Sequence, residues 1–103
     1  MDNCLFCKII NKEIPSEFIY EDDLCVAFND IKPKAPTHVL LVPKKHIDSI
    51  MTLEEEDRDI VSHLVYIAKK IAEDKGLEGY QLKFHVGEKG GQEIFHLHLH
   101  LLG

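Results

Sequence analysis

Hydrophobic and polar positions follow a helical period at the start of the chain. Four apolar residues recur at helical spacing, which predicts a short helix that ends near Pro15. These residues are Leu5, Phe6, Ile9 and Ile10. Two apolar runs follow at residues 18–20 and 24–28 with acidic residues between them, so we expect two strands joined by a tight turn.

Prolines divide the middle of the chain. Pro33 and Pro36 predict a loop over residues 29–36, because proline cannot donate to a sheet ladder. Residues 37–42 form the expected third strand. The continuous apolar run within it predicts that both faces of this strand are covered.

The helical period returns at Thr52 and continues to Gly76, which predicts an amphipathic helix of about six turns. Thr52 and Glu55 have the spacing of a capping box, and a glycine is a typical helix stop. We expect His63 to face solvent. The apolar stripe, with the valines that broaden it, comprises Ile60, Val61, Leu64, Val65, Ile67, Ala68 and Ile71.

Strict alternation marks the end of the chain, where histidines and leucines interleave over residues 96–101. In a strand, all the imidazoles would project to one face and the leucines to the other. A strand over residues 80–86 and a glycine-rich turn over residues 87–92 precede it, which predicts a terminal hairpin. The elements together predict one α+β domain, residues 1–103, with a mostly antiparallel five-stranded sheet, one long helix and a short N-terminal helix.

Composition narrows the classes of function. The net charge of −6 at pH 7 is unfavourable for binding a nucleic-acid backbone, and no apolar run reaches the ~20 residues of a membrane helix. The N-terminal sequence lacks the pattern of a secretory signal, and three cysteines do not make a disulfide framework. We therefore expect a cytoplasmic protein without nucleic-acid or membrane partners, and its small size favours a homo-oligomer.

His96, His98 and His100 are the strongest candidates for chemistry. An affinity tag would be an uninterrupted run, and packing alone gives little reason to place three imidazoles on one face. This pattern is compatible both with a metal site and with a nucleophilic histidine. The glycine-rich turn adds backbone N–H groups that can bind an anion, so the two segments together predict phosphoryl or nucleotidyl transfer without an obligatory metal at the reacting centre.

Cys4 and Cys7 are spaced to share one helix face. That spacing suits half of a zinc site, and it equally suits two small buried residues. Cys25 lies inside an apolar run, where we expect a core position. His38 and His46, near the two ends of the third strand, are further candidate site residues.

The segment His96–Leu102 resembles the signature of the histidine triad superfamily, in which three histidines alternate with apolar residues. Other segments resemble its Hint branch, the purine nucleoside phosphoramidases. They are Cys7–Ile10, Glu13–Ser16, Ala35–His38, Pro43–His46 and Gly90–Phe95. This resemblance spans essentially the whole chain, and it implies a homodimer whose sheets join across the interface, with a purine mononucleotide in each site.

The resemblance implies unequal roles for the histidines. His98 would attack the α-phosphate and form a nucleotidyl-histidine that water then hydrolyses. His96 and His100 would flank it, with His100 touching the phosphate, and His38 would support the relay.

Around the histidines, the resemblance implies a nucleotide site. The backbone of Gly91 and Gln92 would bind the phosphate, the Gln92 side chain would lie close to the leaving group, and Asp30 would accept the ribose hydroxyls. Apolar side chains would line the base and sugar; they are Leu5, Phe6, Ile9, Phe28, Ile31 and Leu40.

Two positions depart from the branch. His85 stands where many members carry Asn near the phosphate, and Glu93 stands where eukaryotic members often carry Ser. Some microbial members bind structural zinc through a CxxC pair and two histidines. The matching set in this chain is Cys4, Cys7, His46 and His96, and two thiolates with two imidazoles suit tetrahedral zinc.

The leading interpretation is a nucleoside phosphoramidase that needs no cofactor for its chemistry and carries a structural zinc. The alternatives are a dinucleoside polyphosphate hydrolase of the same superfamily and a nucleotide-binding interaction module without catalysis. A catalytic three-histidine metal site is weakened because no obvious carboxylate base lies nearby.

Overall fold

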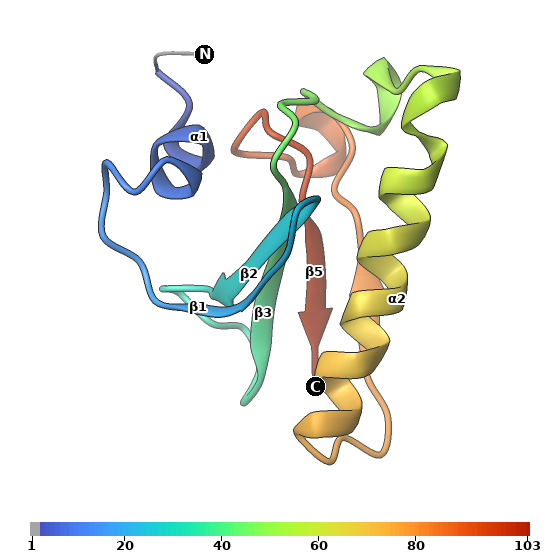
Figure 1. Cartoon of the computed structure of the whole chain (residues 1–103). Helices are drawn as coiled ribbons and strands as arrows, with labels where there is room; N and C mark the ends of the chain where they lie inside the picture. Colours follow the sequence, from blue (N-terminus) through green and yellow to red (C-terminus); the bar gives the residue numbers. More distant parts are fainter. Residues whose placement is uncertain (1–2) are drawn as a thin grey trace.

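The computed structural model describes residues 3–103, in which a five-stranded sheet lies between two helices (Figure 1). The strand order is β1-β2-β3-β5-β4 and all neighbours are antiparallel, which confirms the predicted α+β class. The first two residues of the predicted domain lie outside the described residues. The elements are α1 Leu5–Ile10, β1 Phe18–Glu21, β2 Cys25–Asn29, β3 His38–Pro43, α2 Arg58–Asp74, β4 Gln81–Lys83 and β5 Leu99–Leu102, with 3-10 turns η1 Ile50–Thr52, η2 Glu55–Asp57 and η3 Glu88–Gly90.

The sheet buries both of its faces. One face packs against α2 with alternate residues of β2 and β3, Cys25 among them, and with the three leucines that alternate with the histidines. The opposite face packs against α1; its buried residues are Phe6, Ile9, Val26, Phe28, Leu40 and Val42. The predicted separation of leucines and histidines is confirmed, and the histidine side is the side covered by α1 (Figure 1).

The helix α1 ends at Ile10, earlier than the predicted end near Pro15. Lys12 adopts a left-handed φ of 64°, which turns the chain away from the helix axis. The Glu13 N–H then donates to the Lys8 carbonyl at 2.9 Å and closes the last turn. The helix therefore ends through local backbone geometry, before proline can interrupt it.

The long helix α2 begins at Arg58, so the predicted start at Thr52 is wrong. Thr52 belongs to a capping box with Ser49 around η1, and Asp57 bonds back to Glu54 around η2. Each pair of capping residues closes its own short turn, and α2 has 17 residues, just under five turns instead of six. Among residues 3–103, no helix is long and apolar enough to cross a membrane.

Two residues on α2 differ from their predicted surroundings. Val65 does not broaden the buried stripe, because its side chain is 40% exposed. His63 is half-buried instead of facing solvent, and its Nε2 lies 2.6 Å from Oδ2 of Asp22. This contact joins α2 to the turn between β1 and β2.

The two C-terminal strands are shorter than predicted. β4 covers only Gln81–Lys83, and β5 begins at Leu99, so only His100 of the three histidines lies in the ladder. Pro43 ends β3 and has no N–H to continue the pairing. Residues 96–98 instead bond to the loop after β3, through His96 Nε2 to the Pro43 carbonyl and Leu97 N–H to the Ile47 carbonyl.

Candidate active site and metal centre

Three imidazoles gather where β3 and β5 meet, and we call His38, His98 and His100 the histidine row. The register pairs Leu40 with His100 and His38 with Leu102, so His38 and His100 are diagonal neighbours on one face. The His98 and His100 ring centroids are 4.9 Å apart, and the edge of Phe6 from α1 packs against His98 at 5.0 Å. Strand register and α1 therefore build the row together.

Hydrogen bonds to backbone groups define the tautomers along the row. The Lys34 N–H donates to His38 Nδ1 at 3.0 Å, so the proton of His38 is on Nε2. That Nε2–H donates to His100 Nδ1 at 2.9 Å, which places the His100 proton on its own Nε2. Within residues 3–103, His100 Nε2 is buried and has no partner, so it presents an unused N–H donor.

His98 has the opposite orientation. Its Nδ1 donates to the His96 carbonyl at 2.7 Å, which leaves the lone pair on Nε2. Burial lowers the pKa of His98, and burial with the neighbouring imidazoles lowers the pKa of His100 to about 4. Both rings are therefore neutral near pH 7, and a lone pair on His98 lies beside an N–H donor on His100.

Cys4, Cys7, His46 and His96 converge on one point, and we call them the thiol–histidine cluster. The distances from Cys4 Sγ to His96 Nδ1 and from Cys7 Sγ to His46 Nδ1 are both 3.3 Å, and Cys7 Sγ lies 3.6 Å from His96 Nδ1. Tetrahedral zinc with ordinary bond lengths separates its sulfur and nitrogen ligands by about 3.3–3.8 Å. The spacing of the cluster fits that ion.

The second nitrogen of each cluster histidine supports the same conclusion. His96 Nε2 donates to the Pro43 carbonyl at 2.8 Å and His46 Nε2 lies 2.7 Å from Asp48 Oδ1, so both Nδ1 lone pairs face the sulfurs. Burial, together with the neighbouring Cys4, raises the pKa of Cys7 to about 11. A cation is therefore required to hold the Cys7 sulfur as a thiolate near pH 7.

Two other clusters contain potential metal ligands, but their atoms lie too close together. In the cluster of Asp22, Cys25 and His63, carboxylate and imidazole are 2.6 Å apart. His38 and His100, which cluster with Asp30, are 2.9 Å apart. Both distances are those of hydrogen bonds and are shorter than the edge of a tetrahedral zinc site, about 3.3 Å.

The six residues of the predicted nucleotide wall divide by exposure. Four of its members, Phe6, Ile9, Phe28 and Leu40, are buried on the histidine side of the sheet. Leu5 is 42% exposed and Ile31 is 92% exposed, so these two lie outside the packed wall. Asp30 accepts from the Lys32 N–H with Oδ1, and its Oδ2 lies 3.5 Å from His38 Nε2, beside the row.

The glycine-rich loop differs from the predicted phosphate cradle. The N–H groups of Gly91 and Gln92 donate to the carbonyls of Glu88 and Gly87. The Gln92 side chain is buried; its amide donates to the carbonyls of Asp48 and Ile94 and accepts from the Gly87 N–H. Gly87 and Gly91 have positive φ angles, and these internal bonds close the loop around them. The Gln92 amide therefore supports the loop and is not free to meet a leaving group.

The two positions that differ from the Hint branch, His85 and Glu93, lie on either side of this loop. His85 precedes it and stacks on His100, with ring centroids 4.6 Å apart. Glu93 follows it and lines a hollow beside the thiol–histidine cluster. The other residues around this hollow are Asn3, Cys4, Leu5, His46, Ile94 and Phe95.

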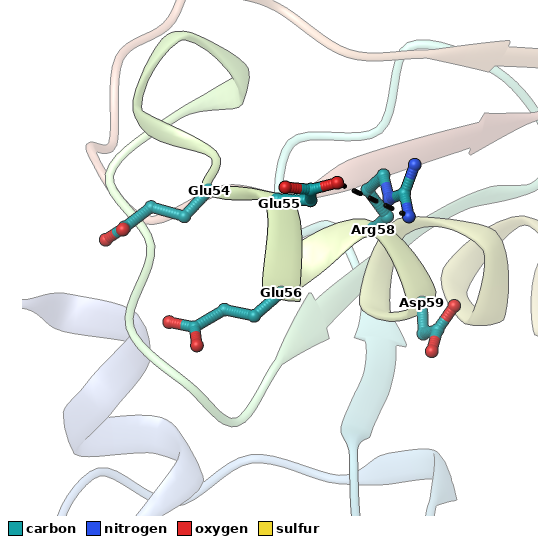
Figure 2. Close-up of a pocket in the computed structure, with 5 residues that line it drawn as sticks. All are labelled: Glu54, Glu55, Glu56, Arg58 and Asp59. Carbon is teal, nitrogen blue, oxygen red and sulfur yellow. Dashed lines mark ion pairs between the residues drawn. The ribbon is translucent and has the colours of Figure 1, made fainter.

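A second hollow, at the start of α2, contains none of the candidate residues. Figure 2 shows its charged lining, four carboxylates and Arg58, whose guanidinium lies 3.9 Å from Glu55.

The sequence did not predict the groups that orient the site histidines, which belong to Lys34, Pro43 and Asp48. Of these, only Asp48 carried a signal, a carboxylate placed close after His46.

Comparisons with known proteins identify the family of this chain. Residues 3–103 match the DcpS_C family, described as scavenger mRNA decapping enzyme C-term binding. Protein HitA of Neisseria gonorrhoeae is 45% identical, over 100% of this chain and 97% of that protein. A HIT family hydrolase from Legionella pneumophila Philadelphia 1 has a TM-score of 0.95 at 50% identity, covering 98% of this chain and 92% of that one. A histidine triad protein from Clostridium difficile has a TM-score of 0.94 at 51% identity, covering 99% and 90%. The chain therefore belongs to the histidine triad (HIT) family and has the fold of its hydrolases.

Proposed function

We propose that this protein hydrolyses purine nucleoside 5′-phosphoramidates through a covalent nucleotidyl-histidine on His98. The observation that carries the proposal is that a nitrogen lone pair on one imidazole lies beside an N–H donor on the next. His98 Nε2 holds the lone pair, and the neighbouring His100 Nε2–H is buried and meets no acceptor in the described part of the chain. A neutral imidazole attacks phosphorus well, and a donor without competing partners stabilises the charge on the phosphoryl oxygens.

In the first step, His98 Nε2 forms a bond to the α-phosphorus, and the bond from phosphorus to the leaving amine breaks. The His96 carbonyl accepts the Nδ1–H of His98 and stabilises the positive charge that develops on the ring. His38 holds the His100 proton on the side that meets the phosphoryl oxygen. In the second step, water attacks the nucleotidyl-histidine and releases the mononucleotide.

The rest of the site supports a nucleotide as substrate. Phe6, Ile9, Phe28 and Leu40 form a buried apolar layer on the histidine side of the sheet. The exposed Leu5 and Ile31 are the apolar side chains available to a base and sugar. Oδ2 of Asp30 is the acceptor we assign to the ribose hydroxyls. The purine and the amine leaving group follow from the resemblance to the Hint branch.

Trapping the intermediate tests this proposal. Wild-type protein is mixed with an adenosine 5′-phosphoramidate of an alkylamine and quenched rapidly in alkaline denaturant, which preserves phosphorus–nitrogen bonds. Mass spectrometry should find an AMP adduct on a peptide containing His98. A binding module without catalysis gives no adduct, and a dinucleoside polyphosphate hydrolase gives the adduct only when a dinucleotide replaces the phosphoramidate.

We also propose that the thiol–histidine cluster holds a structural zinc ion. The ion would join α1, through Cys4 and Cys7, to the loop after β3 and to the segment that carries His98. The ligands close the coordination sphere with four protein atoms, as in structural sites, so we assign it no step of the reaction. Thiol ligands suit a reducing compartment, and a cytoplasmic location stays our prediction.

We further propose a homodimer in which β4 pairs with β4 of a second copy about a two-fold axis. β4 is at one edge of the sheet and all three of its residues are exposed, including Leu82 at 37%. An unpaired edge strand presents free N–H and C=O groups to a partner. Light scattering should give the dimer mass for wild type and the monomer mass for Leu82→Lys. Ile19→Lys on the opposite edge strand, β1, is the matched control and should remain dimeric.

A further inference from the structure

The proposed reaction requires a proton that the histidine row cannot supply. An alkylamine leaves phosphorus as a neutral molecule only if its nitrogen gains a proton while the bond breaks. His98 cannot donate it, because Nε2 is the attacking atom and Nδ1–H is bonded to the His96 carbonyl. Another group near the phosphorus must act as the acid.

His100 is the nearest donor, but its proton cannot be replaced. If His100 gave up its Nε2–H, His38 would have to pass a proton to His100 Nδ1. His38 would then have no ring proton, because its Nδ1 faces the backbone N–H of Lys34, which donates and cannot accept. The chain from Lys34 to His100 therefore orients one hydrogen-bond donor and does not conduct protons.

His85 is the remaining imidazole beside this site. Its ring stacks on His100 with centroids 4.6 Å apart and planes inclined by 32°. A Cβ built on Gly91 would lie 3.9 Å from Nδ1 of His85, so the ring also borders the glycine-rich loop. The residue is exposed, and within residues 3–103 neither of its ring nitrogens has a hydrogen-bond partner. It can thus exchange protons with solvent, which no other imidazole around His100 does as freely.

We infer that His85 is the general acid that protonates the leaving amine, an inference that rests on the proposed phosphoramidate hydrolysis. His98 and His85 both pack against His100, so nucleophile and acid are neighbours of the same phosphate-facing donor. In the first step, the electron pair of the phosphorus–nitrogen bond goes to the amine nitrogen, which takes the proton of the His85 imidazolium. In the second step, water attacks the phosphorus as the phosphorus–His98 bond breaks and releases its proton to solvent, and the exposed His85 regains its own proton from solvent.

This assignment predicts a substrate class. Substrates whose leaving group is basic, such as alkylamines, need His85, whereas a leaving group that departs as a stable anion does not. His85→Asn is the matched variant, because asparagine can hydrogen-bond but cannot transfer a proton. Two AMP derivatives provide the contrast, an alkylamine phosphoramidate and a p-nitrophenyl ester.

The expected result is a loss that depends on the leaving group. His85→Asn should lower kcat for the phosphoramidate by about 10²- to 10³-fold, the usual contribution of a general acid, and should change kcat for the ester by less than about threefold. His63→Asn, which removes an imidazole from α2, is the control and should change neither rate. Melting temperatures of both variants verify that they are folded.

Equal losses on both substrates would overturn the inference, because His85 would then only shape the site. No loss on either would overturn it as well. The proposed function fails in a different way, with wild-type protein cleaving the ester but not the phosphoramidate. The two failures are therefore distinguishable in the same set of assays.

Discussion

The thiol–histidine cluster and the histidine row use the same side chain for different chemistry, and His96 links them. In the cluster, carbonyl and carboxylate groups accept from Nε2 of His96 and His46, so the Nδ1 lone pairs converge on the thiols. In the row, a backbone N–H donates to His38, so the protons alternate and end in an unused donor on His100. The partner of the second nitrogen decides whether a ring presents a lone pair, as His96 and His98 do, or an N–H donor, as His100 does.

Removing the nucleophile gives the largest expected effect. His98→Ala should lower kcat by at least about 10⁴-fold, because the covalent route is lost. AMP binding should be largely retained, since the apolar wall and Asp30 are unchanged. Steady-state kinetics and calorimetric titration with AMP measure the two quantities. A variant that hydrolyses phosphoramidate at nearly the wild-type rate would show that another group is the nucleophile.

Removing the metal should have the next largest effect, which is a loss of folding stability. Protein purified without chelator should contain about one zinc per chain. Its removal should lower the free energy of unfolding by about 4 kcal/mol, as expected for a ligand present at about 1,000 times its Kd, and the melting temperature by at least about 15 °C.

Two cysteine variants separate the metal from ordinary core packing. Cys7→Ser should lose the zinc together with this stability. Cys25→Ala removes a buried thiol from the core against α2 and should keep the full zinc content. A wild-type protein with less than about one zinc per two chains would contradict the proposed site.

The sequence predicted the parts of the fold that burial imposes. Alternation of histidine and leucine correctly indicated two faces, and the apolar stripe indicated α2, because periodic patterns follow which side of an element is covered. The start of α2 was misplaced because Ser49, Thr52, Glu54 and Asp57 all have capping chemistry, and only tertiary packing selects among them.

The candidate site was predicted by residue type but not by proton position. The four cluster ligands converge as expected. Two of the groups that define the tautomers, the Lys34 N–H and the Pro43 carbonyl, belong to the backbone and have no sequence signal, whereas the Asp48 carboxylate lies close after His46. The sequence predicted free N–H groups in the glycine-rich loop. These groups instead form hydrogen bonds within the loop, to Gly87, Glu88 and Gln92, and no sequence pattern indicates those bonds.

Breaking the hydrogen bond between His38 and His100 tests the role of the row more finely. His38→Ala removes the bond that holds the His100 proton on Nε2, so kcat should fall by about 10²-fold, as for the loss of one oriented donor. Nitrogen-15 NMR of the imidazoles should show His100 changing from one tautomer to a mixture. Lys34→Ala keeps the backbone N–H that bonds His38 and is the matched control, with unchanged kcat. An unaltered His100 tautomer in His38→Ala would show that His38 does not fix the position of the His100 proton.

The contact between His63 and Asp22 provides the smallest expected effect and a third arrangement of histidine, as the partner of a carboxylate that joins α2 to the β1–β2 turn. Burial alone would raise the pKa of Asp22, but hydrogen bonds from Tyr20, His63 and the Cys25 and Leu24 N–H groups together outweigh it and lower that pKa. A carboxylate with a lowered folded-state pKa stabilises the fold at pH values above its unfolded-state pKa of about 4. This contribution is lost as the pH falls below that value.

Asp22→Asn should therefore lower the free energy of unfolding by about 1–2 kcal/mol at pH 7, with a difference that shrinks below about pH 4. Urea denaturation at several pH values measures both. Because Asp22 contacts α2, which packs on the face of the sheet opposite the row, kcat at pH 7 should not change. A stability difference that is the same at pH 3 and pH 7 would show that the charge of Asp22 does not hold α2 against the β1–β2 turn.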